Sequence, residues 1–130
     1  MVTKAERLIY EQVLERDRLL FWEWVLPLNQ TSFAEWKAHD PWVCAARTMA
    51  VIASQESGLC SGVMTRDHVH THTGGTKGKR PETSMETVLI LCSFHHLNSP
   101  WAVTHRPRIR TYIKEANERY RVFADRGGPA

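Results

Sequence analysis

The chain has 130 residues, of which 42% are hydrophobic and 24% are charged, and this composition excludes wholesale disorder. At this length a single domain buries roughly two-thirds of its unfolded surface, so we expect one domain over residues 1–130. No apolar run approaches the roughly 18 residues that a membrane span needs, and the first residues lead into no signal-like segment. We therefore expect a cytoplasmic protein without a membrane partner.

The net charge of +3 is unevenly distributed along the chain. Residues 1–63 hold six basic and eight acidic side chains, whereas residues 64–130 hold eleven basic and six acidic ones. A cation-rich half predicts a polyanionic partner, with DNA as the first candidate. The three cysteines, Cys44, Cys60 and Cys92, are too few and too widely spaced for a secreted disulfide framework, which favours reduced thiols that could bind metal.

The first third of the chain predicts helices. Apolar residues at helical spacing indicate a long helix over residues 3–26, which Pro27 ends. Its nearly all-apolar end, residues 19–25, is expected to face the core. A capping-box pattern that starts at Ser32 predicts a short helix over residues 33–38.

Asp40 and Pro41 form an N-cap pattern, which predicts a third helix from Pro41 to about Gln55, before Gly58. Cys44 falls inside this helix, where a small buried hydrophobic residue is favoured over a metal ligand. The expected buried face consists of Trp42, Ala45, Ala46, Met49, Val51 and Ile52.

The hydrophobic period changes in the second half of the chain. Residues 59–69 and 86–91 are typical of strands, and the loop between them carries the turn signal Gly74-Gly75. A helical turn is expected to start near Ser93.

A basic helix is expected to follow, beginning around Pro107 and capped by Thr104. The order of elements predicts an α+β fold. It would consist of a helical part over residues 1–58, a strand–strand–helix core over residues 59–98 and a basic C-terminal helix over residues 104–124.

One aspartate and three histidines gather at residues 66–72, and two more histidines follow a cysteine at residues 92–96. Hydrolysis of a phosphodiester with one metal ion needs a base for the attacking water, a cation for the leaving oxygen and a group that orients the base. Neighbouring strand residues point to opposite faces, so Asp67 and His68 cannot share one face of a strand. If the strand ends there and turns, Asp67 could hold the metal while His68 reaches the water from another direction. His96 on the following helix could supply a second ligand.

These residues resemble the motif of the HNH endonucleases of phage and bacterial type, which have a ββα-metal fold. The similarity covers residues 64–97, and residues 13–17 also resemble a Val-Leu-x-Arg-Asp segment that often precedes the motif. The matching positions are Asp67-His68-Val69, Gly74-Gly75, the apolar strand from Thr87 to Cys92, and Cys92-Ser93-Phe94-His95-His96.

The resemblance implies a DNA endonuclease that nicks or cleaves both strands and leaves 5′-phosphate and 3′-hydroxyl ends. It implies that His68 is the general base and that Asp67 and His96 bind one divalent ion, which would be Mg²⁺, Mn²⁺, Ni²⁺ or Zn²⁺. Thr87 stands where the family has an asparagine that holds the catalytic histidine and the hairpin loop. A threonine hydroxyl offers a shorter side chain with fewer hydrogen bonds for that task.

Many members of this family also carry a structural zinc bound by two Cys-x-x-Cys pairs. Here Cys92 and His95 would form one pair and Cys60 would begin the other, with Cys44 or His72 as the candidate fourth ligand. The alternative is a core that is stable without zinc.

Eight basic residues are candidates for contact with nucleic acid: Arg66, His70, Lys77, Lys79, Arg80, Arg106, Arg108 and Arg110. The alternative for each is a solvated surface position. Two further functions stay open beside the endonuclease. One is a catalytically weakened HNH-fold protein that binds DNA or a targeting protein partner, and the other is a zinc-stabilised interaction protein with a tryptophan-rich surface.

Overall fold

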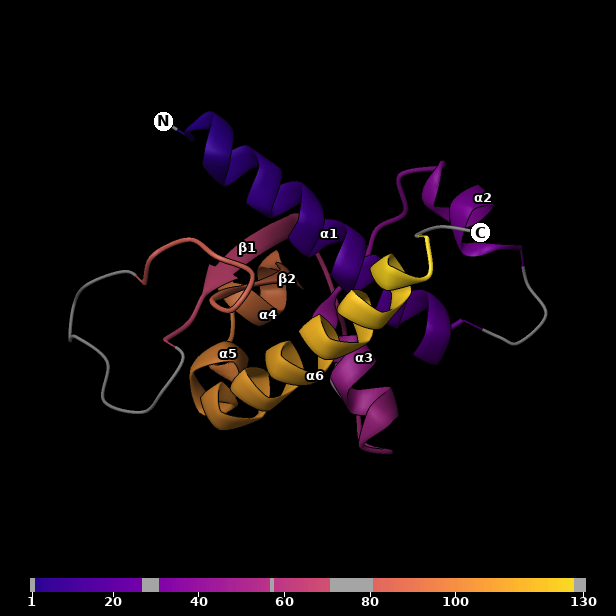
Figure 1. The fold of residues 1–130 in the computed structure, drawn as a ribbon. Coiled ribbons are helices and arrows are strands. Elements are labelled where there is room, and N and C mark those ends of the chain that lie inside the picture. The colour runs from indigo at the N-terminus through magenta and orange to yellow at the C-terminus, as the bar shows by residue number, and fades with distance from the viewer. Residues whose placement is uncertain (1, 27–30, 57, 71–80, 128–130) are drawn as a thin grey trace.

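The computed structural model describes residues 2–26, 31–56, 58–70 and 81–127, and it combines helices with a two-stranded antiparallel sheet. The predicted mixture of helix and sheet is therefore confirmed. In chain order the elements are α1 (Lys4–Trp24), α2 (Phe33–Lys37), α3 (Ala45–Ile52), β1 (Met64–His68), β2 (Val88–Cys92), α4 (Ser93–His96), α5 (Trp101–Thr104) and α6 (Arg106–Asp125) (Figure 1).

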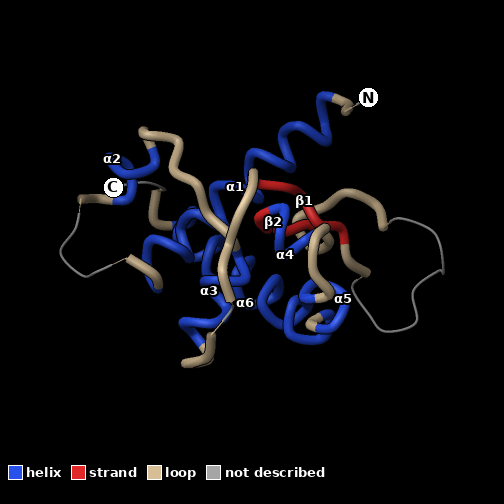
Figure 2. Tube along the Cα trace, turned by 180° about the vertical axis from the view of Figure 1, so that it is seen from behind, coloured by secondary structure: helices blue, strands red, loops and turns tan. Residues whose placement is uncertain are grey.

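The long helix α1 begins with a capping box at its first turn. Thr3 Oγ1 accepts a hydrogen bond from the Glu6 N–H at 3.0 Å, and the Glu6 carboxylate accepts one from the Thr3 N–H at 3.2 Å. From there α1 packs on β2, α3 and α6 (Figure 1 and Figure 2). Within the described residues, no helix has both the length and the apolar character needed to cross a membrane.

The sheet is a hairpin in which β1 pairs antiparallel with β2, with Asp67 opposite Leu89. The first strand is shorter than the predicted 59–69, while every residue of β2 is buried, as a core strand requires. Because strand side chains alternate, Thr65 and Asp67 share one face of β1 and Arg66 and His68 share the other. Helix α4 follows β2 directly, with Cys92 as its N-cap.

The prediction of a helix from Pro41 was wrong, because α3 begins only at Ala45. Asp40 adopts a positive φ of 48° and its carboxylate lies 3.9 Å from Arg18 Nη1, so it does not cap a helix. Cys44 occupies the N-cap position in an extended conformation, with φ −142° and ψ 123°. The cysteine is therefore at the start of the helix and not in its interior.

The predicted buried face of this helix was wrong at three positions. Trp42 is 39% exposed because it precedes α3, and Val51 and Ile52 are 41% and 38% exposed because they lie at its outer end. The predicted cap at Thr104 was also wrong. Thr104 belongs to α5, and its hydroxyl donates to the Trp101 carbonyl within that helix.

A buried polar network ties α1 to the hairpin and to α6. Asp17 accepts hydrogen bonds from Arg16 Nε at 3.0 Å, from the Ile90 N–H at 2.8 Å and from the Tyr112 hydroxyl at 2.7 Å. Arg16 also donates to the Val88 carbonyl at 2.7 Å. Since Arg16 and Asp17 are almost completely buried, the pair fixes where α1 lies on the sheet.

Candidate functional site

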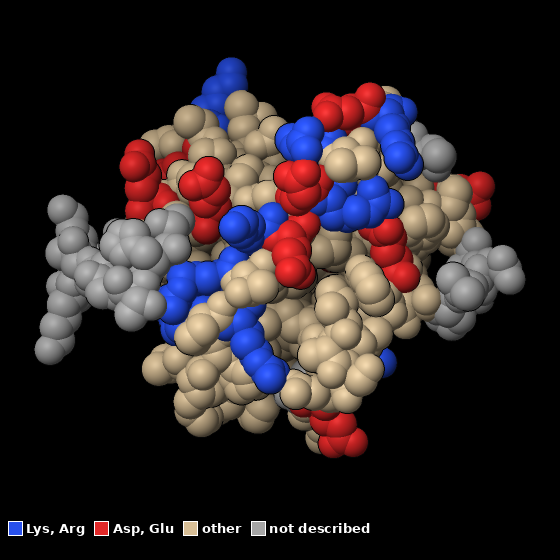
Figure 3. Space-filling model, turned by 60° about the horizontal axis from the view of Figure 1, so that its bottom comes forward, with Lys and Arg blue, Asp and Glu red and all other residues tan. Residues whose placement is uncertain are grey.

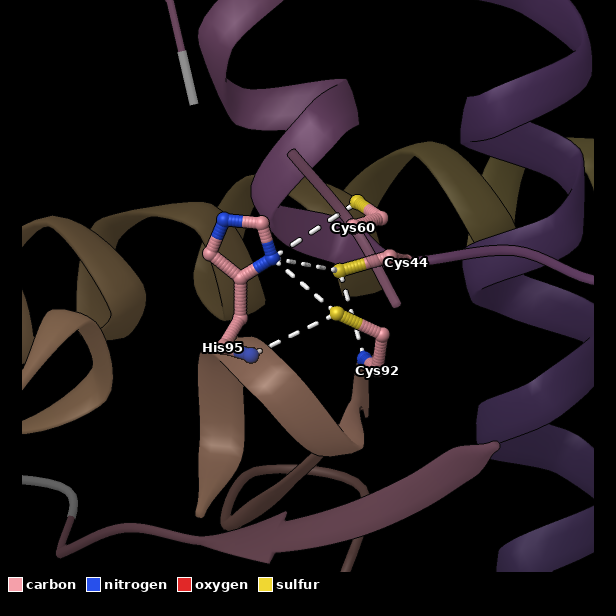
Figure 4. Close-up of side chains that lie close together, drawn as sticks. All are labelled: Cys44, Cys60, Cys92 and His95. Carbon is pink, nitrogen blue, oxygen red and sulfur yellow. Dashed lines mark hydrogen bonds between the residues drawn. The ribbon is translucent and has the colours of Figure 1, made fainter. Parts of the chain in front are cut away.

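Three cysteines and a histidine from separate segments converge beneath the hairpin. Cys44 precedes α3, Cys60 lies in the segment before β1, Cys92 ends β2 and His95 lies on α4. One ligand atom of each residue lies within 4.8 Å of those of the other three. The His95 Nδ1 atom is 3.7 Å from Cys44 Sγ, 3.6 Å from Cys60 Sγ and 3.1 Å from Cys92 Sγ (Figure 4).

Backbone amides help to orient the sulfur atoms of this Cys₃His cluster. The Cys92 N–H donates to Cys44 Sγ at 3.3 Å, and the His95 N–H donates to Cys92 Sγ at 3.4 Å (Figure 4). Burial raises the pKa of the Cys44 thiol well above its ordinary range. Burial also opposes ionisation of Cys92, but hydrogen bonds from the backbones of His95 and Ser61 and the nearby imidazole bring its pKa down to about 7.

This donor set could bind a metal ion. Thiolate sulfur and imidazole nitrogen are the ligands of closed tetrahedral zinc sites, in which metal–ligand bonds of about 2.0–2.3 Å place the ligand atoms roughly 3.5–3.8 Å apart. The sequence had favoured Cys44 as a buried hydrophobic residue and left the fourth ligand open. Cys44 is fully buried in the core, as that interpretation expects, and its thiol also lies with the other three side chains, so it could serve as the fourth ligand. His72 lies outside the described residues.

A second cluster lies on the face of β1 that carries Asp67. The Asp67 side chain is only 4% exposed. One carboxylate oxygen lies 3.3 Å from His96 Nε2, and the other accepts a 2.8 Å hydrogen bond from Arg106 Nη1. Helix α4 supplies the histidine and the first residue of α6 supplies the arginine. The predicted metal ligands Asp67 and His96 are thus brought together.

Thr65, which the sequence did not single out, orients the His96 ring. Its hydroxyl donates to the Leu91 carbonyl at 2.8 Å, so its oxygen must accept the 2.7 Å hydrogen bond from His96 Nδ1. The Nε2 atom is then the ring nitrogen that faces the Asp67 carboxylate. Thr65 could have been found from the sequence, because residues two positions apart on a strand share a face and Thr65 lies two positions before Asp67.

His68 lies on the opposite face of the hairpin, as strand alternation predicted. Its Nε2 atom is 3.2 Å from the Tyr10 hydroxyl and 3.2 Å from Thr83 Oγ1. The Thr83 hydroxyl donates to Glu6 at 3.1 Å, so it can accept a hydrogen bond from the imidazole. The structure therefore separates the side chain of His68 from the face of Asp67 and His96, and the sequence gave no signal for Tyr10 or Thr83.

Thr87 holds the turn that leads into β2. Its hydroxyl donates to the Glu82 carbonyl and accepts a 3.0 Å hydrogen bond from the Ser84 N–H, while its carbonyl accepts one from the Val69 N–H at 2.7 Å. One threonine thus connects the turn before β2 with the end of β1.

We expect Thr87→Val to lower the free energy of unfolding by about 0.5–1.5 kcal/mol, because it removes the hydroxyl and its part-buried hydrogen bonds to the Ser84 N–H and the Glu82 carbonyl. Thr87→Ser keeps the hydroxyl and is the matched control, with a smaller loss. Urea titration followed by tryptophan fluorescence measures both. An equal loss in the two variants would show that the methyl group and not the hydroxyl stabilises the turn.

The candidate nucleic-acid contacts fall in different places. The Arg66 guanidinium lies 4.1 Å from the centroid of the Tyr10 ring, on the His68 face. Arg106 contacts Asp67, whereas Arg108 donates to Gln55 of the segment after α3. His70 and Arg110 are half-buried, and Lys77, Lys79 and Arg80 lie outside the described residues, as do Gly74 and Gly75.

Comparisons with protein-family models, with curated proteins and with solved structures found no match to this chain. The kind of site in this chain is therefore inferred from the arrangement of its side chains. It combines a buried cluster of soft donors that could hold a metal ion with a separate carboxylate–imidazole pair beside an arginine.

Proposed function

We propose that this protein is a metal-dependent endonuclease of the HNH type that hydrolyses DNA phosphodiester bonds. The observation that carries the proposal is the convergence of Asp67, His96 and Arg106 at the junction of hairpin and helix. A carboxylate and an oriented imidazole suit one divalent ion with open positions for phosphate and water. The order Asp67-His68 on β1 and His96 on the following helix is that of the family motif.

A divalent ion held by Asp67 and His96 would supply positive charge to the leaving 3′ oxygen. Arg106 is placed to bind the scissile phosphate, since a guanidinium matches the geometry of phosphate oxygens. Its present partner is the Asp67 carboxylate, so substrate and protein compete for the same donor.

We assign proton removal from the attacking water to His68. The Thr83 hydroxyl, which already donates to Glu6, lies within hydrogen-bond distance of His68 Nε2. Because β1 ends at His68, we assign the attacking water to the end of this strand. Tyr10 and Thr83 would then fix the orientation of the base.

We further propose that the Cys₃His cluster holds a structural Zn²⁺. Its donors are buried or half-buried and all four come from protein, which is typical of closed structural sites and leaves no position for substrate. The ion would tie the segment before α3 to the hairpin and to α4. Zinc would thus support the active site without taking part in the reaction.

Cleavage of supercoiled plasmid in Mg²⁺, Mn²⁺ or Ni²⁺ tests the endonuclease. We expect His68→Ala to lower the rate by roughly 10²–10⁴-fold, the range of a general base. Asp67→Asn and His96→Ala should also raise the metal concentration needed for half-maximal cleavage. His39→Ala changes an exposed histidine distant in sequence from the motif and is the control. Equal cleavage by wild type and all three site variants would refute the mechanism.

A DNA-binding module without nuclease activity is the second candidate. The observation that favours it is the position of the His68 imidazole, which contacts Tyr10 and Thr83 on the face opposite Asp67. Saturable DNA binding by the wild type, with no cleavage in any of the three metals, would support this function. Metal-dependent cleavage that His68→Ala abolishes would exclude it.

A further inference from the structure

Helix α6 carries its basic side chains on two different flanks. Its buried residues are Ile109, Tyr112, Ile113 and Ala116, which define the side that faces the core. At 100° per residue, positions 106, 110 and 114 fall together on one flank of that side. Arg108 falls on the other flank, where it contacts Gln55.

The flank of Arg106, Arg110 and Lys114 begins at the candidate active site. Arg106 touches Asp67, and Arg110 and Lys114 follow at intervals of four residues and line a surface groove along α6. Lys114 is exposed and Arg110 is half-buried, so both groups border solvent. The space-filling view shows Lys and Arg side chains gathered in a band across one face of the molecule, with acidic side chains set among them (Figure 3).

We infer that this row, Arg106–Arg110–Lys114, is a track for the phosphates of one nucleic-acid strand that leads away from the Asp67–His96 pair. Four helical residues rise about 6 Å, so the row extends over about 12 Å. One strand of duplex DNA presents a phosphate roughly every 3.4 Å along its axis. Long side chains over this distance can therefore reach a short run of consecutive phosphates. The starting point of the track rests on the proposed endonuclease function.

Acidic residues limit the length of the track. Glu118 lines the same groove but is paired with Arg121, which also contacts Asp125, so the last turns of α6 have little net charge. Glu86, from the turn before β2, also lines this groove and reduces the positive potential there. The cationic surface is thus concentrated in the first three turns, next to the candidate active site.

Salt-dependent binding separates this row from a general attraction to DNA. Fluorescence anisotropy with a short labelled duplex, without added divalent ion, would give the affinity of the full chain at several salt concentrations. We expect Arg110→Gln and Lys114→Gln each to reduce the slope of log affinity against log salt by about 1, and the double variant by about 2. Arg108→Gln removes the same charge from the other flank and should leave the slope unchanged.

The outcomes distinguish the row from the nuclease. The duplex could bind through Arg110 and Lys114 and yet remain uncleaved in Mg²⁺, Mn²⁺ or Ni²⁺. That result would support the phosphate track and refute the endonuclease function. Equal slope changes for Arg108→Gln, Arg110→Gln and Lys114→Gln would refute the proposed phosphate track, because a cation on either flank of α6 would then contribute equally to DNA binding. Unchanged slopes for Arg110→Gln and Lys114→Gln would overturn it as well. Circular dichroism confirms that each variant is folded.

Discussion

Replacing Asp17 with alanine is expected to lower the free energy of unfolding by about 3–5 kcal/mol, the cost of breaking a buried charge pair. The substitution leaves the Arg16 guanidinium, which is 0% exposed, without its carboxylate. It also removes the acceptor for the Ile90 N–H and for the Tyr112 hydroxyl, so β2 and α6 each lose a tie to α1.

Urea denaturation of metal-loaded protein measures this loss. Asp40→Asn is the control, because Asp40 also faces an arginine but its side chain is 92% exposed and 3.9 Å away, and asparagine tolerates the positive φ at this position. A change within about 0.5 kcal/mol is expected there. If Asp17→Ala cost no more than Asp40→Asn, the network would not hold α1 in place.

The sequence marked this pair without revealing its role. Residues 13–17 were recognised only as similar to a segment that often precedes the HNH motif. The partners of Asp17 are Ile90 and Tyr112, and a separation of 73 to 95 positions cannot be inferred from local spacing. Helical periodicity placed α1 correctly, whereas its polar contacts depend on tertiary packing.

The candidate site was predictable where local rules act. Strand alternation placed Asp67 and His68 on opposite faces, and spacing selected His96 as the partner of Asp67. Local rules failed at Cys44, because Asp40 and Pro41 give a strong helix-start pattern. The chain instead stays extended up to Cys44, whose thiol lies with Cys60, Cys92 and His95. The position of the Cys44 thiol beside these side chains depends on tertiary packing, which local sequence patterns do not reveal.

Helix α4 connects the two clusters. Its successive residues His95 and His96 point about 100° apart, the first into the Cys₃His cluster and the second toward Asp67. A four-residue helix has little stability of its own. The contacts that fix His95 therefore also fix the position of His96 on the same helix. Loss of a metal from the Cys₃His cluster should accordingly weaken the contact between Asp67 and His96.

Removal of the proposed zinc from the Cys₃His cluster is accordingly expected to destabilise the folded chain. An ion present at about a thousand times its dissociation constant stabilises the folded state by about 4 kcal/mol, which corresponds to roughly 10–20 °C in Tm for a domain of this size. We expect purified protein to contain one zinc per chain and a strong chelator to lower Tm by that amount, and zinc should restore it. A metal-free protein whose Tm does not respond to chelator or to zinc would contradict the assignment.

Comparison of variants at two histidines distinguishes a role in metal binding from a role in packing. His95 and His105 both lie against the Trp101 ring, with centroid distances of 5.3 Å and 4.5 Å, but only His95 belongs to the cluster. His95→Ala should lose the bound zinc and the chelator response, and His105→Ala should keep both. Since His96 depends on α4, the His95 variant should also need more Mn²⁺ for half-maximal DNA cleavage. Retention of one zinc per chain by His95→Ala would show that the imidazole packs in the core without binding the ion.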